Sequence, residues 1–74
     1  RVLKDGYISM ESAQNIIVVR TVTGMGMAVA TAIDILEISG IVGCIAGDDT
    51  VFCAIKSEDK TQEVMEKIGK LIAQ

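Results

Sequence analysis

Two adjacent carboxylates, Asp48 and Asp49, are the side chains of this sequence best suited to chemistry. They follow Gly47 between two apolar runs, a pattern that predicts a tight hairpin turn. One turn aspartate is explained by bonds from its side chain to nearby backbone N–H groups, but the second is explained less well. Because neighbouring carboxylates repel and no cation lies within several residues, the pair is expected to need a positive partner.

Three partners would meet this need: a metal ion, a basic residue of a neighbouring subunit, or a cationic ligand. A hard metal ion would need further oxygen ligands, and none is evident near Asp48 and Asp49 in the sequence. A guanidinium fits better, since its planar fork can meet carboxylates with two hydrogen bonds at a time. The sequence therefore favours a guanidinium partner and predicts no metal site.

A third carboxylate, Asp34, is the only ionisable side chain between Gly24 and Leu36. Its segment is otherwise apolar or small, and its Ala, Met and Leu content predicts a helix. Two interpretations remain open. Asp34 lies either at the exposed edge of the helix, or at a contact between subunits where it recognises a charged group.

The two cysteines, Cys44 and Cys53, flank the acidic turn. Counting outward from a two-residue loop at Asp48 and Asp49 places them opposite each other, in a non-hydrogen-bonded pair whose side chains approach closely. A cross-strand disulfide is conceivable, but two buried thiols acting as small apolar side chains are favoured. With so few cysteines, a reduced, cytoplasmic setting is the default expectation.

Hydrophobic periodicity predicts an α+β fold of six elements. Ser12, Gln14 and Asn15 are expected to form a turn between the first two strands. The predicted strands are Val2–Met10 with a bend at Gly6, Asn15–Val22, Ile41–Ala46 and Val51–Lys56, and the predicted helices are Met25–Glu37 and Lys60–Ala73.

The helix and the strand predicted in the central part of the chain both carry apolar residues on more than one face. The helix over Met25–Glu37 is apolar nearly all round, which is typical of a helix buried on more than one side. In the strand over Ile41–Ala46, the alternation points Val42 to one face and Ile41 and Ile45 to the other, and neither face is polar. The pattern therefore predicts self-association.

Length and composition exclude several classes of function. The 74 residues allow one domain, 1–74, and a net charge of −3 argues against binding phosphates. Without histidine or a nucleophile–base pair the chain is not expected to be an enzyme, and one Tyr and one Phe make no base-stacking surface.

No segment reaches the roughly 20 apolar residues of a membrane span. Since the chain starts at Arg1 without Met, it is expected to be part of a longer protein.

The segment Val42–Phe52 resembles the Gly-Thr-Ile-Ala-Gly-Asp-Asp-Thr-Ile signature of arginine repressors. Upstream, Asn15–Thr21 is similar to the second strand of that family's C-terminal domain. The stretch from Thr23 to Leu36 is similar to its Pro-Gly-…-Asp-x-Leu helix. The resemblance covers essentially the whole chain, in order and with similar spacings.

This resemblance implies a two-layer ββαββα sandwich, with a four-stranded, mostly antiparallel sheet and two helices packed on it. Domains of this kind form homo-trimers that stack into homo-hexamers, with the co-repressor L-arginine bound between trimers. The implied function is effector sensing and oligomerisation in a repressor of arginine metabolism genes, with DNA bound only through an N-terminal winged-helix domain outside these residues. The alternative is an assembly module without a ligand. No other cofactor is implied.

The resemblance also implies roles for single residues. Asp48 and Asp49 match the aspartates that hold the arginine guanidinium. Asp34 matches the helix aspartate that lines the same site and receives the amino end of the ligand. The segment Ala46 and Gly47 matches the backbone that borders the site.

The sequence departs from the family pattern at Met27 and Thr23. Met27 stands where the family often has Gln or His in contact with the ligand, and a thioether is a poor substitute as a hydrogen-bonding group. Thr23 stands where proline is usual and is compatible with the same turn.

Overall fold

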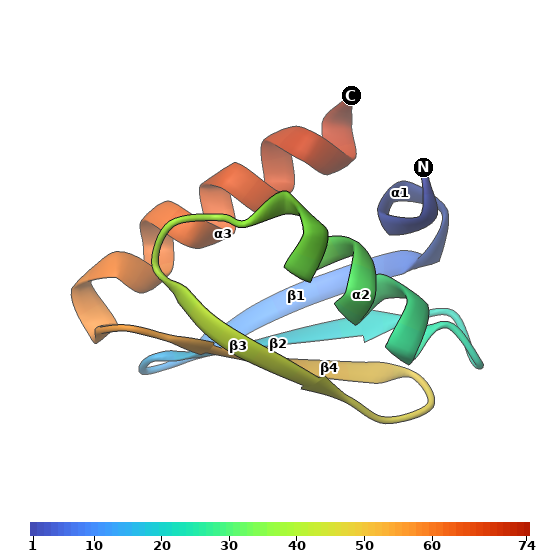
Figure 1. Cartoon of the computed structure of the whole chain (residues 1–74), viewed down its shortest axis with the longest axis horizontal. Coiled ribbons are helices and arrows are strands. Elements are labelled where there is room, and N and C mark those ends of the chain that lie inside the picture. Colours follow the sequence, from blue (N-terminus) through green and yellow to red (C-terminus); the bar gives the residue numbers. More distant parts are fainter.

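Three helices cover one face of a four-stranded antiparallel sheet in the computed structural model, which describes residues 1–74 (Figure 1). The strand order is β1-β2-β4-β3, so β1 and β3 form the two edges. The elements are α1 (Val2–Gly6), β1 (Tyr7–Ala13), β2 (Ile16–Thr21), α2 (Gly26–Leu36), β3 (Ile41–Ala46), β4 (Thr50–Ile55) and α3 (Glu58–Ala73).

This arrangement confirms the α+β prediction, and the last five predicted elements match to within two residues at each end, but the strand predicted over Val2–Met10 was wrong. Residues from Val2 to Gly6 form a short helix, so there are three helices rather than two, and the strand begins at Tyr7. Leu3 and Gly6 are buried, and a Cβ added at Gly6 would lie 2.7 Å from Val29 Cγ2. Packing against α2 and the rest of the core thus determines this turn of helix, because one turn is too short for local propensity to decide.

The predicted turn at the end of the first hairpin was also too long. Ser12 belongs to β1, which runs to Ala13, and only Gln14 and Asn15 form the turn. Gln14 takes a positive φ of 56°, and the Asn15 side chain donates a hydrogen bond to the Ile55 carbonyl at 3.2 Å. This bond anchors the turn to the end of β4.

The core lies between the sheet and the helices. Alternate residues of β2 and β4 point into it, as period-two strands require, and α2 and α3 contribute one face each. The eleven buried apolar residues are Leu3, Ile17, Val19, Val29, Ala30, Ile33, Val51, Cys53, Ile55, Val64 and Ile68.

The outer face of the sheet carries exposed apolar side chains on β3 and β4 although no helix covers it. Ile45 is 75% exposed and Phe52 is 49% exposed. The register of β3 shifts between Ile41 and Gly43. Because of this irregularity, Ile41 packs against the core and Val42 is exposed on the same face as Ile45. The alternation predicted the reverse, with Ile41 on the face of Ile45 and Val42 on the opposite face.

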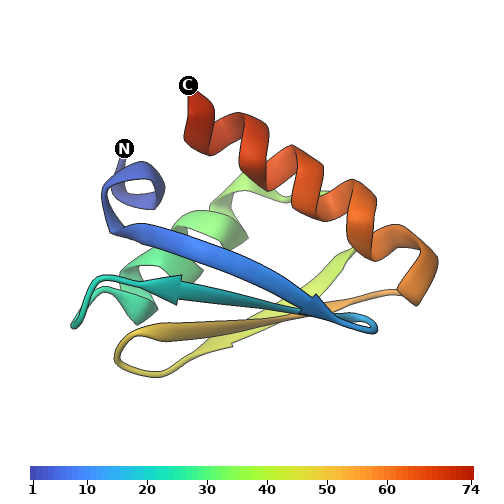
Figure 2. The ribbon, with the colours of Figure 1, turned by 180° about the vertical axis from the view of Figure 1, so that it is seen from behind.

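The two ends of the chain lie side by side at one end of the helical layer (Figure 1). Figure 2 shows α1 beside the last turn of α3, and the Lys4 ammonium donates a hydrogen bond to the Gln74 carbonyl at 2.9 Å. None of the helices has the length and apolar character that spanning a membrane requires.

Candidate functional site

The acidic turn is held by the connection between β2 and α2. The carbonyl oxygen of Asp48 accepts hydrogen bonds from the N–H groups of Gly24 and Gly26, both at 3.0 Å. The Asp49 carbonyl accepts a third from Thr21 N–H at 2.8 Å. Backbone N–H groups of the β2–α2 connection therefore hold the turn, while both of its aspartate side chains remain exposed.

Glycine is required where these two loops touch. Gly24 has a φ of +85°, a conformation that L side chains rarely adopt. At Gly26, an added Cβ would overlap the carbonyl oxygen of Gly47. The start of α2 consequently lies directly against the acidic turn.

Both carboxylates of the turn are exposed, and neither forms an ion pair within the chain, whose one ion pair joins Lys67 and Glu63. The Asp49 carboxylate accepts a hydrogen bond from the Thr50 hydroxyl at 2.9 Å. This bond orients the Asp49 carboxylate. Because both carboxylates are exposed, the turn presents two adjacent negative charges to solvent.

Arg20 is the residue near this site that sequence reasoning missed. Its guanidinium donates a hydrogen bond to the Thr50 hydroxyl at 3.1 Å, and that hydroxyl donates to Asp49. Arg20 lies opposite Thr50 because β2 pairs with β4. Arg20 is far from the turn along the chain, so only the pairing of β2 with β4 could have identified it.

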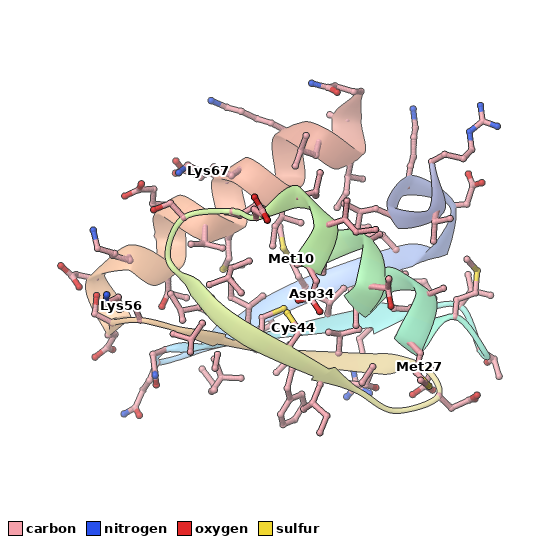
Figure 3. All side chains as sticks on the ribbon, viewed as in Figure 1. Met10, Met27, Asp34, Cys44, Lys56 and Lys67 are labelled. Carbon is pink, nitrogen blue, oxygen red and sulfur yellow. The ribbon has the colours of Figure 1, made fainter.

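The structure gathers three of the other predicted residues at or near the turn. Gly47 begins it, and Ala46 is the last residue of β3, half-buried opposite Val51. Met27 is the second residue of α2 and is 73% exposed, and Figure 3 shows it beside the β3–β4 hairpin end. One edge of the molecule thus carries Met27, Ala46, Gly47, Asp48 and Asp49.

Asp34 is not part of this group within one chain. It lies eight positions after Gly26, about 12 Å along the axis of α2 at 1.5 Å per residue. It lines an open groove of about 560 Å³ together with Cys44 and Ile41, and Figure 3 shows it next to Cys44. Asp34 is exposed in the single chain, which both interpretations allow.

The two cysteines face each other as predicted, with their sulfur atoms 3.1 Å apart and both thiols free. The hydrogen bond with Cys53 lowers the pKa of the Cys44 thiol, although burial and the nearby Asp34 carboxylate act against it. The hydrogen bond with Cys44 and burial raise the pKa of Cys53. The two thiols are therefore chemically unequal.

The arrangement of the acidic turn suits the binding of a cation from outside the chain. No three side chains of the types His, Cys, Asp and Glu gather around a common point that would hold a metal ion. Two neighbouring carboxylates on a rigid backbone, beside exposed apolar residues, match a ligand that carries both a delocalised positive charge and an apolar stem.

Comparison with known proteins identifies relatives over the whole chain. The family model for the arginine repressor C-terminal domain matches residues 3–70. The arginine repressor of Lachnoclostridium phytofermentans is 64% identical over 72 residues, covering 97% of this chain and 47% of that protein. The arginine repressor of Lachnospira eligens is 58% identical over 71 residues, 96% of this chain and 47% of that protein. The chain spans about half the length of these curated relatives.

Proposed function

The chain belongs to the arginine repressor family, as its C-terminal domain, and from this premise we propose that it senses L-arginine and assembles the repressor. The observation that carries the proposal is the exposed Asp48–Asp49 pair, which has no cation of its own within salt-bridge distance. A guanidinium bound there would satisfy both carboxylates. Each charge-assisted hydrogen bond of this kind contributes roughly 1.5–3 kcal/mol when shielded from water.

The binding site in this proposal is completed by more than one subunit. Asp48 and Asp49 hold the guanidinium, the backbone of Ala46 and Gly47 borders it, and Met27 contacts the ligand's apolar stem. Asp34, some 12 Å along α2 from the turn, receives the amino end of an arginine held mainly by another copy of the chain. Because such a site is shared between subunits, ligand binding and assembly are thermodynamically coupled.

Assembly follows from the exposed apolar surfaces. Ile45 and Phe52 on the sheet and Ile35 on α2, which is 74% exposed, would be covered by neighbouring subunits in a homo-trimer, and two trimers would stack into a homo-hexamer. Without ligand, acidic turns that meet at the stacking interface repel one another. Arginine replaces this repulsion by attraction, and linkage requires that assembly strengthen arginine binding equally.

The rest of the protein supplies DNA binding in this account. Since this chain is about half the length of its relatives, we place the DNA-binding domain in a segment outside it. Joining several such domains in one hexamer raises the affinity for DNA through effective concentration. The whole protein then acts in the cytoplasm as a repressor of arginine metabolism genes and has no catalytic role.

Calorimetric titration with L-arginine and L-citrulline tests this function. Citrulline keeps the length of arginine but carries a neutral ureido group in place of the guanidinium. We expect saturable binding of arginine and at least tenfold weaker binding of citrulline, because the carboxylate pair recognises charge. Equal binding of the two, or no binding of arginine, would contradict the proposal.

A second candidate function is a ligand-independent assembly module. The observation that favours it is Met27, whose exposed thioether beside the turn offers a ligand no strong hydrogen bond. A thermal-shift screen across the amino acids separates the two functions. Only a sensor gains stability when its ligand is added.

A further inference from the structure

The β3–β4 hairpin places Cys44 directly opposite Cys53 at a position that suits a covalent bond. The N–H of Gly47 donates to the Thr50 carbonyl, so residues 47 and 50 form a hydrogen-bonded pair. Pairs alternate along an antiparallel ladder, and Cys44 with Cys53 is therefore a non-hydrogen-bonded pair, a type whose Cα atoms typically lie about 4.5 Å apart. That typical separation falls within the range found for disulfides, so this backbone is compatible with a bond between the sulfurs.

The two thiols differ in access. Cys44 is half-buried and lines the open groove beside Asp34, whereas Cys53 is fully buried in the core. A small molecule in the groove meets Cys44 first, and Cys53 is 3.1 Å behind it. This is the geometry of an attacking thiol with a resolving thiol in contact.

The pKa shifts of the two thiols agree with Cys44 as the attacking thiol and Cys53 as the resolving thiol. The hydrogen bond with Cys53 lowers the pKa of Cys44, which raises the fraction of thiolate at the sulfur that lines the groove. The hydrogen bond with Cys44 and burial raise the pKa of Cys53. The half-buried thiol that lines the groove, Cys44, is thus the more nucleophilic one.

We propose that Cys44 and Cys53 form a modification site at which a hydroperoxide closes a reversible disulfide. The Cys44 thiolate attacks one peroxide oxygen, an S–O bond forms, the O–O bond breaks, and hydroxide leaves. Hydroxide takes the Cys53 proton to give water, and the Cys53 thiolate then attacks the Cys44 sulfur. The S–S bond forms, the S–O bond breaks, and the departing hydroxide takes a proton from solvent. Two thiols lose two electrons in total, and hydrogen peroxide is reduced to two molecules of water.

Disulfides formed across strands are readily reversed by thiols when they are strained or exposed. The product would cross-link β3 to β4 just behind the acidic turn and would remove the Cys44 proton from the groove that Asp34 lines. The modification does not depend on whether the turn binds arginine.

Treatment of the reduced chain with hydrogen peroxide, followed by thiol titration and intact-mass analysis, tests the proposal. We expect free thiols to fall from two to none per chain, with a mass lower by two hydrogens, a peptide linking Cys44 to Cys53, and full reversal by dithiothreitol. Retention of both thiols, or linkage only between different chains, would overturn it.

Two matched variants assign the roles of the sulfurs. Cys53→Ala is expected to stop at a Cys44 sulfenic acid that dimedone traps, and Cys44→Ala is expected to leave Cys53 reduced. Oxidation of Cys53 in Cys44→Ala as fast as in the unmodified chain would contradict the assignment. Because the experiment on the unmodified chain needs no substitution, the proposal stays testable if a variant fails to fold.

Discussion

Gly26 packs so closely against Gly47 that no side chain fits between them, since a Cβ at position 26 would overlap the Gly47 carbonyl oxygen. The same contact lets the Gly26 N–H bond to the Asp48 carbonyl at 3.0 Å. The first residue of α2 is therefore part of the structure that holds the acidic turn. A change at Gly26 should affect both stability and ligand binding.

Gly26→Ala is expected to lower the free energy of unfolding by about 1–3 kcal/mol, the usual cost of overpacking, and to weaken arginine binding by displacing the turn. Gly69→Ala is the matched control. Its Cβ would meet only Met10 Cε at 3.8 Å inside α3, so it should stabilise the chain by about 0.5–1 kcal/mol. Chemical denaturation measures both. A Gly26→Ala variant as stable as the unmodified chain would show that the two loops are not in firm contact.

Thr50→Val is expected to weaken arginine binding about three- to tenfold, because it removes the hydroxyl that connects Arg20 to Asp49 and fixes the carboxylate. Thr50→Ser keeps this hydroxyl and should bind like the unmodified chain. Calorimetry compares the two variants. If both bind arginine equally well, the orientation of Asp49 does not depend on Thr50.

Ile45→Asp is expected to disrupt assembly with little effect on the fold of a single chain, because Ile45 is 75% exposed on the outer face of the sheet. Exposed substitutions usually change the free energy of unfolding by less than about 0.5 kcal/mol. Sedimentation velocity should show smaller species than the unmodified chain, which should form trimers and, with L-arginine, hexamers. If Ile45→Asp assembles like the unmodified chain, the outer face of the sheet does not take part in subunit contacts.

The rate of peroxide oxidation should rise with pH around a midpoint below that of an ordinary cysteine. The reason is that the Cys53 hydrogen bond lowers the pKa of Cys44, and only the thiolate reacts. Cys53→Ala removes this bond, and the midpoint should move to higher pH. Stopped-flow kinetics over a pH series measures the shift, and a midpoint that does not move would exclude Cys53 as its cause.

The sequence was sufficient where local chemistry decides the structure. The Gly-Asp-Asp turn determined the hairpin register, and the prediction that Cys44 faces Cys53 is confirmed. The helix at Val2–Gly6 could not be predicted, because contacts with residues distant in sequence determine it.

The same limit applies to the site. Arg20 reaches Thr50 only because β2 lies next to β4, and strand order is not visible in local periodicity. The exposure of Val42 follows from a register shift in β3 that alternation alone cannot reveal. Whether Asp34 shares a ligand with Asp48 and Asp49 depends on how subunits are arranged, which is a property of the assembly.

The central claim is that the paired carboxylates of the acidic turn bind the arginine guanidinium. Calorimetric titration of L-arginine into the Asp48→Asn, Asp49→Asn double variant tests it most directly, with circular dichroism and sedimentation as checks that the fold and the trimer persist. Because both side chains are exposed, the substitutions should leave the fold intact and abolish arginine binding. Undiminished affinity for arginine in a folded double variant would contradict the account.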